Sequence, residues 1–222
     1  MPIHQFEFYI LIMRIIPSLE QGNYYHIYSR GTNGETIFRE EKNYDYFLDK
    51  WKFYIPSVAE TFAYSLLVNH FHALIKVKTG VLMHKNKTGI EYPAIPDRQF
   101  SHLLNGYAQG FNKTYTRTGS LFEHPFKREP IDNKKQLINA LAYILFNPQK
   151  HEFAVDFRKY PFSSYQMMMT EANSFIQKER IFEWFGGKEK FIEYMDSYEQ
   201  RFKFKYFREI NSKALKNRSV GL

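Results

Sequence analysis

Hydrophobic and polar residues alternate along some stretches of this chain and recur at helical spacing along others. Residues 23–30 alternate and are rich in Tyr and Ile, which predicts a strand, and the glycines of residues 31–34 predict a turn after it. Residues 41–54 repeat apolar side chains every three or four positions, which predicts a helix. The apolar run of residues 61–77 predicts two strands, or one long strand bent around Asn69.

The second half of the chain predicts two longer helices and another strand. Helical periodicity covers residues 100–115 and residues 134–147, and Pro148 is expected to end the second helix because proline has no N–H to continue it. Residues 126–131 predict a strand between the two helices. The order strand, helix, two strands, helix, strand indicates an α+β fold with helices on one face of an antiparallel sheet.

The remaining segments predict a loop, an N-terminal arm and a C-terminal extension. Residues 78–98 show no periodicity and predict a loop, and short helical pieces after residue 160 lead into a basic tail. No stretch approaches the ~20 apolar residues of a membrane span. Residues 8–16 are the nearest candidate, but Arg14 interrupts them, so they are expected to form a strand or a packed arm, and no membrane partner is expected.

Composition limits the chemistry that the chain can carry. With 222 residues, of which 44% are hydrophobic, the chain can bury a full core in one domain with an appendage. It has no cysteine, which excludes disulfides, thiolate metal sites and cysteine nucleophiles and fits a reducing cytosol. Any metal ion would therefore be held by imidazole, carboxylate or amide groups.

The charge and the aromatic content favour a polyanionic partner. The net charge is +8 and the isoelectric point is about 9.4. Much of the excess lies in residues 201–222, which hold seven Lys and Arg residues and one Glu. Aromatic residues make up 18% of the chain, and Tyr and Phe interleaved with basic residues suit stacking on nucleobases. A solvated tail and ordinary core packing are the alternatives.

Two histidines flank one apolar residue at His70-Phe71-His72. On a strand, His70 and His72 point to one face of the sheet and Phe71 points to the other. Two imidazoles about 7 Å apart on one face can hold a divalent ion. The alternative is a pair of hydrogen-bonded structural histidines.

The helix expected over residues 134–147 is apolar around well over half of its circumference, so it is expected to be largely buried. The remaining narrow stripe is polar and consists of Gln136, Asn139, Tyr143 and Asn147. One interpretation is that this stripe faces water. In the other, Tyr143 and Asn147 face the histidine pair, so that a tyrosine hydroxyl can attack a substrate while an amide oxygen becomes a third metal ligand.

Three motifs in this order resemble those of the single-tyrosine HUH transposases, which include the IS200-like and the REP-associated tyrosine transposases. They lie in residues 69–72, 112–128 and 143–148. Residues 25–31 are also similar to the first strand of that family. The resemblance extends over about residues 22–152, and three motifs in order are more specific than any one of them.

The resemblance implies a ferredoxin-like sheet with the histidine pair on a central strand. It implies a divalent metal ion, Mg²⁺ or Mn²⁺, held by His70, His72 and Asn147, and it implies Tyr143 as the nucleophile. The implied substrate is single-stranded DNA that bears a hairpin, cleaved and transferred through a 5′-phosphotyrosine in a bacterial cytoplasm. The protein is expected to act as a monomer or a homodimer.

On this basis three regions are expected along the chain. They are an N-terminal arm over residues 1–21, a DNA-nicking domain over residues 22–160, and a helical extension with a basic tail over residues 161–222. Five basic residues are candidate DNA contacts: Arg30, Lys113, Arg117, Lys127 and Arg128.

Attack by a tyrosine needs assistance from its surroundings. A free phenol has a pKa near 10, so forming the phenolate at pH 7 costs about 4 kcal/mol unless a cation or a base is near. Tyr107 and Tyr115 are rival nucleophiles, but neither is followed at helical spacing by a polar partner comparable to Asn147. Tyr143 is therefore the preferred nucleophile.

Two other functions are compatible with the sequence. One is a non-catalytic, domesticated regulator that binds nucleic acid with the same fold. The other is a metallohydrolase in which water attacks, which would need a further histidine or carboxylate ligand, with Glu123 and His124 as candidates.

Overall fold

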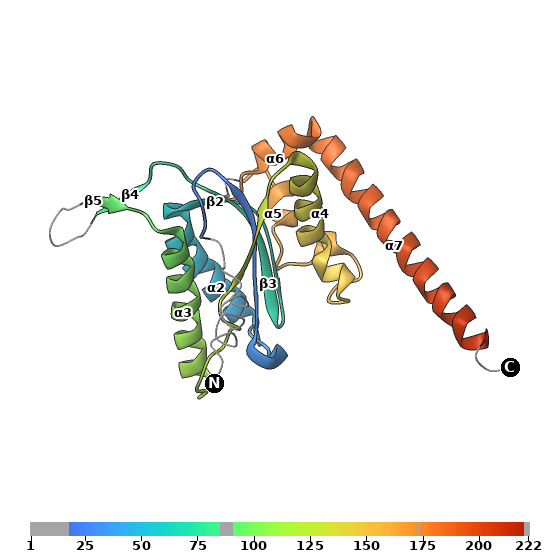
Figure 1. The fold of residues 1–222 in the computed structure, drawn as a ribbon, viewed down its shortest axis with the longest axis horizontal. Coiled ribbons are helices and arrows are strands. Elements are labelled where there is room, and N and C mark those ends of the chain that lie inside the picture. The colour runs from blue at the N-terminus through green and yellow to red at the C-terminus, as the bar shows by residue number, and fades with distance from the viewer. Residues whose placement is uncertain (1–17, 85–90, 173, 220–222) are drawn as a thin grey trace, which may run out of the picture.

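The structure is a computed structural model that describes residues 18–84, 91–172 and 174–219. Residues 1–17, most of the expected N-terminal arm, lie outside the described residues. Figure 1 shows a sheet between two layers of helices and a last helix that extends away from them. In the described part of the chain, no helix has both the length and the apolar character needed to cross a membrane.

Four strands form one antiparallel sheet in the order β2-β3-β1-β6. They are β1 (Tyr24–Arg30), β2 (Ala59–Leu67), β3 (His70–Val77) and β6 (Lys127–Ile131). This order and the helices between the strands are those of a ferredoxin-like βαββαβ unit. The predicted α+β fold is therefore confirmed, and the histidine pair begins a central strand.

Helices cover both faces of the sheet (Figure 1). The two crossover helices, α2 (Glu41–Tyr54) and α3 (Pro96–Thr114), pack together on one face, as predicted. Helix α4 (Lys134–Lys150) lies on the opposite face against β2 and β3. The prediction of helices on one face thus holds for the crossover helices, while α4 and the C-terminal extension form a second layer.

A two-residue turn, residues 68–69, joins β2 to β3. The apolar run of residues 61–77 is therefore mostly a pair of strands and not one bent strand. The N–H of Gly31, just after β1, donates to the carbonyl of Asn69 at 2.8 Å and ties the end of β1 to this turn. A Cβ on Gly31 would lie only 2.1 Å from the carbonyl oxygen of Glu35, so this position requires glycine.

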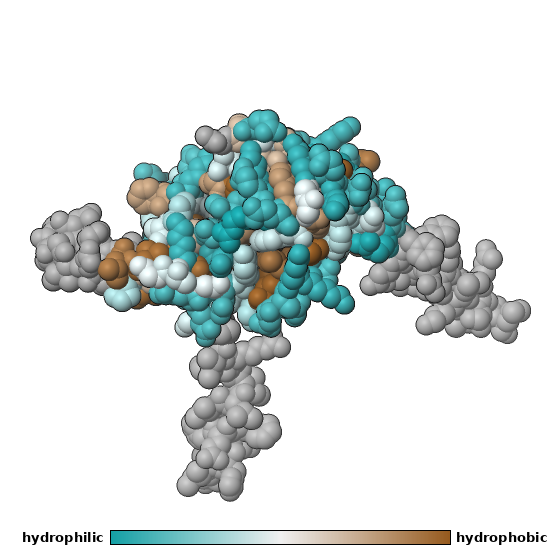
Figure 2. Space-filling view, turned by 90° about the horizontal axis from the view of Figure 1, so that it is seen from above, coloured by the Kyte–Doolittle hydropathy of each residue, from teal (hydrophilic) through white to brown (hydrophobic). Residues whose placement is uncertain are grey.

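Aromatic side chains fill the layer between the sheet and the two crossover helices. Phe71 of β3 packs against Phe47 and Trp51 of α2, with ring centroids 5.0 and 6.3 Å apart. The indole N–H of Trp51 donates to Oγ1 of Thr61 at 2.9 Å, so this buried polar group is satisfied. On the outside, the face seen in Figure 2 is mostly hydrophilic, with hydrophobic side chains in small patches.

Helix α4 continues through Pro148 to Lys150, whereas the sequence predicts an end at Asn147. Proline removes only its own backbone donor, and later N–H groups still close the last turn. The N–H groups of Phe153 and Ala154 donate to the carbonyl of Pro148 at 2.8 and 3.2 Å. Because α4 extends past Asn147, the residue that follows it, His151, lies on the sheet face that carries His70 and His72.

The C-terminal extension packs on the outer side of α4. Phe146 of α4 contacts Phe202 of α7 (Lys188–Ser219), with ring centroids 4.9 Å apart. Arg158 donates to Glu199 of α7 at 2.9 Å. These contacts explain why α4 is apolar around most of its circumference, since one side faces the sheet and another faces α7.

The remaining elements are short. They are η1 (Thr32–Gly34), η2 (Ile55–Ser57), β4 (Leu82–His84), β5 (Glu91–Pro93), η3 (Phe157–Lys159), α5 (Tyr165–Met169) and α6 (Lys178–Phe185). Strands β4 and β5 pair with each other inside the segment expected to be a loop. Helix α7 includes most of the residues expected to form a basic tail.

Candidate active site

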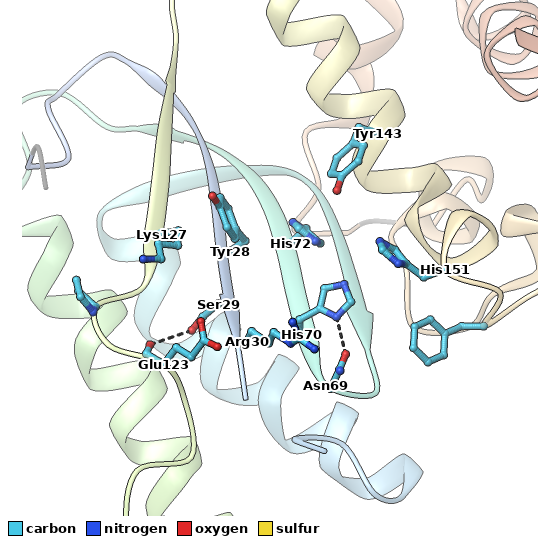
Figure 3. A pocket seen from close by; sticks show the side chains of 12 residues that line it. Tyr28, Ser29, Arg30, Asn69, His70, His72, Glu123, Lys127, Tyr143 and His151 are labelled. Atoms are coloured by element: carbon cyan, nitrogen blue, oxygen red, sulfur yellow. Dashed lines mark hydrogen bonds between the residues drawn. The ribbon is translucent and has the colours of Figure 1, made fainter. Parts of the chain in front are cut away.

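The sheet face under α4 is polar where β1 and β3 meet. His70 and His72 of β3 point to this face and Phe71 points to the opposite one, as predicted. Arg30 of β1 is the register partner of His70. These residues and Tyr143 of α4 surround a cavity of about 430 Å³, which is lined by His70, His72, Arg30 and Tyr143 among others (Figure 3).

The neighbouring Asn69 holds His70 in place. Nδ1 of His70 lies 2.7 Å from Oδ1 of Asn69 (Figure 3). An amide oxygen can only accept, so Nδ1 carries the proton and Nε2 keeps its lone pair. Asn69 is itself fixed by a hydrogen bond from Nδ2 to the carbonyl of Gly34 at 3.4 Å. His70 therefore offers one free nitrogen at the cavity.

A residue of β1, His26, holds His72. Nε2 of His26 lies 2.9 Å from Nδ1 of His72. Oε2 of Glu129, on β6, lies 3.7 Å from Nδ1 of His26, and a carboxylate there favours a proton on that nitrogen. Nε2 of His26 then accepts from Nδ1 of His72, which leaves Nε2 of His72 with its lone pair. Both histidines are thus oriented through one nitrogen and free at the other.

Both histidines are neutral at pH 7. Burial, and then the charges of His151, Arg30 and Lys150, lower the pKa of His70 to about 4. Burial and the neighbouring histidines hold the pKa of His72 well below its ordinary value of 6.5. A neutral imidazole is the form that binds a metal ion.

Tyr143 projects from α4 toward the histidine pair (Figure 3). Its ring lies edge-on to His72, with centroids 5.6 Å apart and an interplanar angle of 84°. Nζ of Lys150 donates to the Tyr143 hydroxyl at 3.3 Å. The structure thus brings together Tyr143, His70 and His72, which the sequence places far apart.

A second tyrosine, Tyr28 of β1, lines the same cavity and was not predicted as a site residue from the sequence. Its ring centroid lies 5.5 Å from that of His72, and its hydroxyl donates to Glu129 at 2.8 Å. Side chains two residues apart on a strand point to the same face, so the position of Tyr28 two residues before Arg30 could have predicted it. The rivals Tyr107 and Tyr115 belong to the α3 side of the sheet, where their hydroxyls are hydrogen-bonded.

Asn147 lies one turn after Tyr143 and is completely buried. Neither its Oδ1 nor its Nδ2 has a hydrogen-bond partner among the described residues, and the residue does not line the cavity. An unpaired buried amide costs roughly 1–3 kcal/mol. Its role as the third metal ligand stays a prediction, but its lack of any other partner is consistent with it.

His151, two turns beyond Tyr143, also lines the cavity and was missed. Its ring centroid lies 5.3 Å from that of His70. Burial, and then the charges of Lys150 and Arg30, lower its pKa below 6.5. The spacing from Tyr143 would have revealed it if the helix had been extended past the proline.

Two of the five basic residues expected to contact DNA line the cavity: Arg30 and Lys127. Both are exposed, and they project from β1 and β6 on the face that carries the histidine pair. A Cβ on Gly34 would lie 2.9 Å from Nη2 of Arg30, so glycine leaves room for the guanidinium. This arrangement places two positive charges at the cavity.

The other three basic residues lie elsewhere. Lys113 lines a separate cavity between α2 and α3. Arg117 forms an ion pair with Glu35. Arg128 forms an ion pair with Asp97, and only 7% of its side chain is exposed. The structure does not bring these three to the cavity, and their contact with DNA stays a prediction.

The described residues contain no group of three His, Asp or Glu side chains placed to hold a metal ion. Glu123 lines the cavity, whereas His124 lines a different pocket. The further ligand that a metallohydrolase would need is therefore not assembled in the described part of the chain.

No family model and no curated protein matches this chain. Among solved structures, it is similar to a REP-associated tyrosine transposase bound to a REP hairpin. The match has a TM-score of 0.50 and 15% sequence identity, and it covers 72% of this chain and 92% of that chain. This similarity establishes the fold.

The chain is also similar to a bacterial tRNA(His) guanylyltransferase (Thg1)-like protein in complexes with GTP and with ATP. The TM-scores are 0.43 and 0.41, and the identities are 11% and 12%. The matches cover 71% of this chain in both cases and 76% and 71% of those chains. At these TM-scores they do not bear on function.

Proposed function

We propose that this protein cleaves single-stranded, hairpin-bearing DNA and transfers the strand through a 5′-phosphotyrosine on Tyr143. One observation carries the proposal: the ring of Tyr143 contacts His72 at a cavity whose rim bears Arg30 and Lys127. The solved transposase of the same fold is bound to a REP hairpin, which supports a hairpin-bearing strand as the substrate class.

The reaction needs no external energy source. Oη of Tyr143 attacks phosphorus, the Oη–P bond forms, and the P–O3′ bond breaks, so that the phosphotyrosine conserves the bond for the second step. Another 3′-hydroxyl then attacks the same phosphorus and releases the tyrosine. Arg30 and Lys127 bind phosphate oxygens and orient the strand in both steps.

The two free imidazole nitrogens at the cavity suit a divalent cation. Nε2 of His70 and Nε2 of His72 would hold it, with the otherwise unpartnered amide oxygen of Asn147 as the third donor. When bound, such an ion polarises the phosphoryl group and stabilises the leaving 3′-oxygen. Imidazole donors suit Mn²⁺ better than Mg²⁺, so we expect both ions to support activity and neither to bind tightly.

One chain supplies both halves of the site. Helix α4 packs on β2 and β3 of its own sheet, and this packing brings Tyr143 to the histidines without a second copy. We therefore propose that the tyrosine acts in cis and that a monomer is competent.

The test is a covalent-adduct assay with single-stranded DNA that carries a hairpin, labelled at the end that stays on the protein, in the presence of Mn²⁺. We expect a protein–DNA adduct that survives denaturing electrophoresis. Tyr143→Phe should abolish it, and Tyr28→Phe, which removes the other phenol hydroxyl in the cavity, should retain it.

Three outcomes would contradict the proposal. DNA binding without an adduct on any hairpin-bearing strand would favour the non-catalytic regulator. DNA cleavage without an adduct, with Tyr143→Phe still active, would favour attack by water. Loss of the adduct in Tyr28→Phe together with its retention in Tyr143→Phe would assign the nucleophile to the other tyrosine.

A further inference from the structure

Lys150 is the last residue of α4 and lies two turns beyond Tyr143 on the same side of the helix. Its Nζ donates to the hydroxyl of Tyr143 at 3.3 Å and lies 4.4 Å from the centroid of the tyrosine ring. The ammonium group thus touches both the oxygen and the ring of one phenol. The helix brings it there only because it continues past Pro148.

The contacts of Lys150 differ from those of two buried or half-buried arginines. Arg128 and Arg158 form ion pairs with carboxylates. In the part of the chain that the structure describes, no carboxylate pairs with Lys150. Its charge adds to the effect of burial in lowering the pKa of His70 and of His151.

We propose that Lys150 is a catalytic residue that stabilises the phenolate of Tyr143 in both halves of strand transfer. The inference rests on the function proposed above and adds to it the group that makes the phenol reactive. Nothing in the sequence motifs assigns a role to this lysine.

The chemistry uses the lysine as a fixed positive charge. In the first step the phenol proton passes to water, the Oη–P bond forms, and the departing 3′-oxygen takes a proton from water. In the second step the incoming 3′-hydroxyl gives its proton to water, its oxygen forms the new P–O3′ bond, the Oη–P bond breaks, and the phenolate leaves and takes a proton from water. Negative charge develops on Oη in both steps, and the ammonium hydrogen bond strengthens with that charge.

The experiment compares single-turnover rates of adduct formation at a saturating concentration of a hairpin-bearing strand. We expect Lys150→Met to slow adduct formation by about 100-fold or more, which is the effect of removing one preorganised donor from a developing oxyanion. Lys150→Arg, which retains the charge, should slow adduct formation far less than Lys150→Met does. Lys135→Met on the exposed first turn of the same helix is the matched control and should react like wild type.

Two further readouts separate catalysis from DNA binding and from folding. The Kd of Lys150→Met for the strand should match that of wild type, and methylammonium should restore part of its rate, which a merely structural lysine would not allow. The purified adduct of Lys150→Met should also transfer its strand to a 3′-hydroxyl more slowly, by a factor similar to that of the first step.

The outcomes distinguish this inference from the proposed function. A wild-type protein that forms no adduct overturns both. A normal wild-type adduct with an unchanged rate in Lys150→Met overturns only the role of Lys150. If Lys150→Met reacts more slowly only because its Kd for the strand rises, and methylammonium does not restore the rate, Lys150 is a phosphate contact and the proposed role in catalysis is wrong.

Discussion

The two faces of the sheet differ in the hydrogen bonding of their buried polar side chains. On the face covered by α2 and α3, aromatic rings fill the space, and Oδ1 of the buried Asn43 accepts from the N–H groups of Arg39 and Glu40. On the face covered by α4, the buried Asn147 and Ser65 carry polar atoms that no described residue satisfies. The first face is filled mainly by aromatic rings, and the second carries a fully buried amide, Asn147, that is unsatisfied among the described residues.

This difference separates structural from functional residues more sharply than residue type does. Tyrosine hydroxyls are hydrogen-bonded within the protein on both faces, so the faces differ most clearly in their buried asparagines, Asn43 and Asn147. Buried groups without partners are costly, and proteins retain them mainly where a ligand uses them. The face, and not the motif alone, therefore predicts what a substitution will do.

The largest expected contrast is between two adjacent residues of β6, Lys127 and Arg128. Arg128 points to the α3 side and pairs with Asp97, so Arg128→Leu removes the ion-pair partner of Asp97, which keeps the hydrogen bond from the N–H of Leu19, and should lower the free energy of unfolding by about 3 kcal/mol. Lys127 lines the cavity and is exposed, so Lys127→Leu should change stability by no more than about 0.5 kcal/mol. Urea unfolding measures both values.

In DNA binding, we expect the larger effect from Lys127→Leu and the smaller effect from Arg128→Leu. Lys127→Leu should weaken binding of single-stranded DNA and reduce the salt slope by about one. Arg128→Leu should leave the salt slope unchanged. If Lys127→Leu is the destabilising change, or Arg128→Leu the one that alters the slope, the assignment of the two faces is wrong.

The next contrast is the dependence of stability on pH in the metal-free protein. Burial and nearby charges lower the pKa of His70 from 6.5 to about 4, so the unfolded chain binds a proton that the folded chain excludes. The contribution of His70 to the free energy of unfolding is therefore fully present above about pH 6.5 and is lost as the pH falls toward 4. At 1.36 kcal/mol per pKa unit, His70 alone accounts for about 3 kcal/mol.

Unfolding by urea at pH 4.5 and pH 7.5, with a chelator present, measures this loss. His70→Gln should remove much of the difference between the two pH values. His102→Gln, which changes an exposed histidine on α3, should leave the difference unchanged. Equal effects of the two substitutions would show that the polar face is not the source of the pH dependence.

The smallest contrast concerns the two buried asparagines. Asn147→Leu removes an amide with no partner and should raise the free energy of unfolding by about 1–3 kcal/mol while weakening Mn²⁺ binding. Asn43→Leu breaks bonds that hold the start of α2 and should lower stability by about 1–3 kcal/mol. Thermal unfolding and Mn²⁺ titration check both, and destabilisation by both substitutions would refute the contrast.

The order of the elements was predictable from the sequence because each has a clear period. The alternation of residues 23–30 and the helical spacing of residues 41–54 correspond to β1 and α2 almost residue for residue. The prediction that His70 and His72 share a face needed only the geometry of a strand. These features depend on local periodicity, which can be read directly from the sequence.

Features that depend on strand register or on the end of a helix were not predictable. Lys127 and Arg128 are both basic, and only the pairing of β6 with β1 shows which one reaches the cavity. Lys150 and His151 were missed because Pro148 predicted a helix end that later backbone hydrogen bonds override. Tyr28 and Glu129 reach the site from neighbouring strands, and their meeting is a tertiary contact.

The proposed reaction requires that Tyr143 forms the covalent bond to DNA. The most direct measurement is mass spectrometry of the digested protein–DNA adduct, because the cavity holds two tyrosines and only the modified peptide separates them. We predict a nucleotide phosphate on the peptide that contains Tyr143 and an unmodified peptide that contains Tyr28. A phosphotyrosine at any other position, or cleaved DNA with no modified peptide, would show that Tyr143 is not the nucleophile.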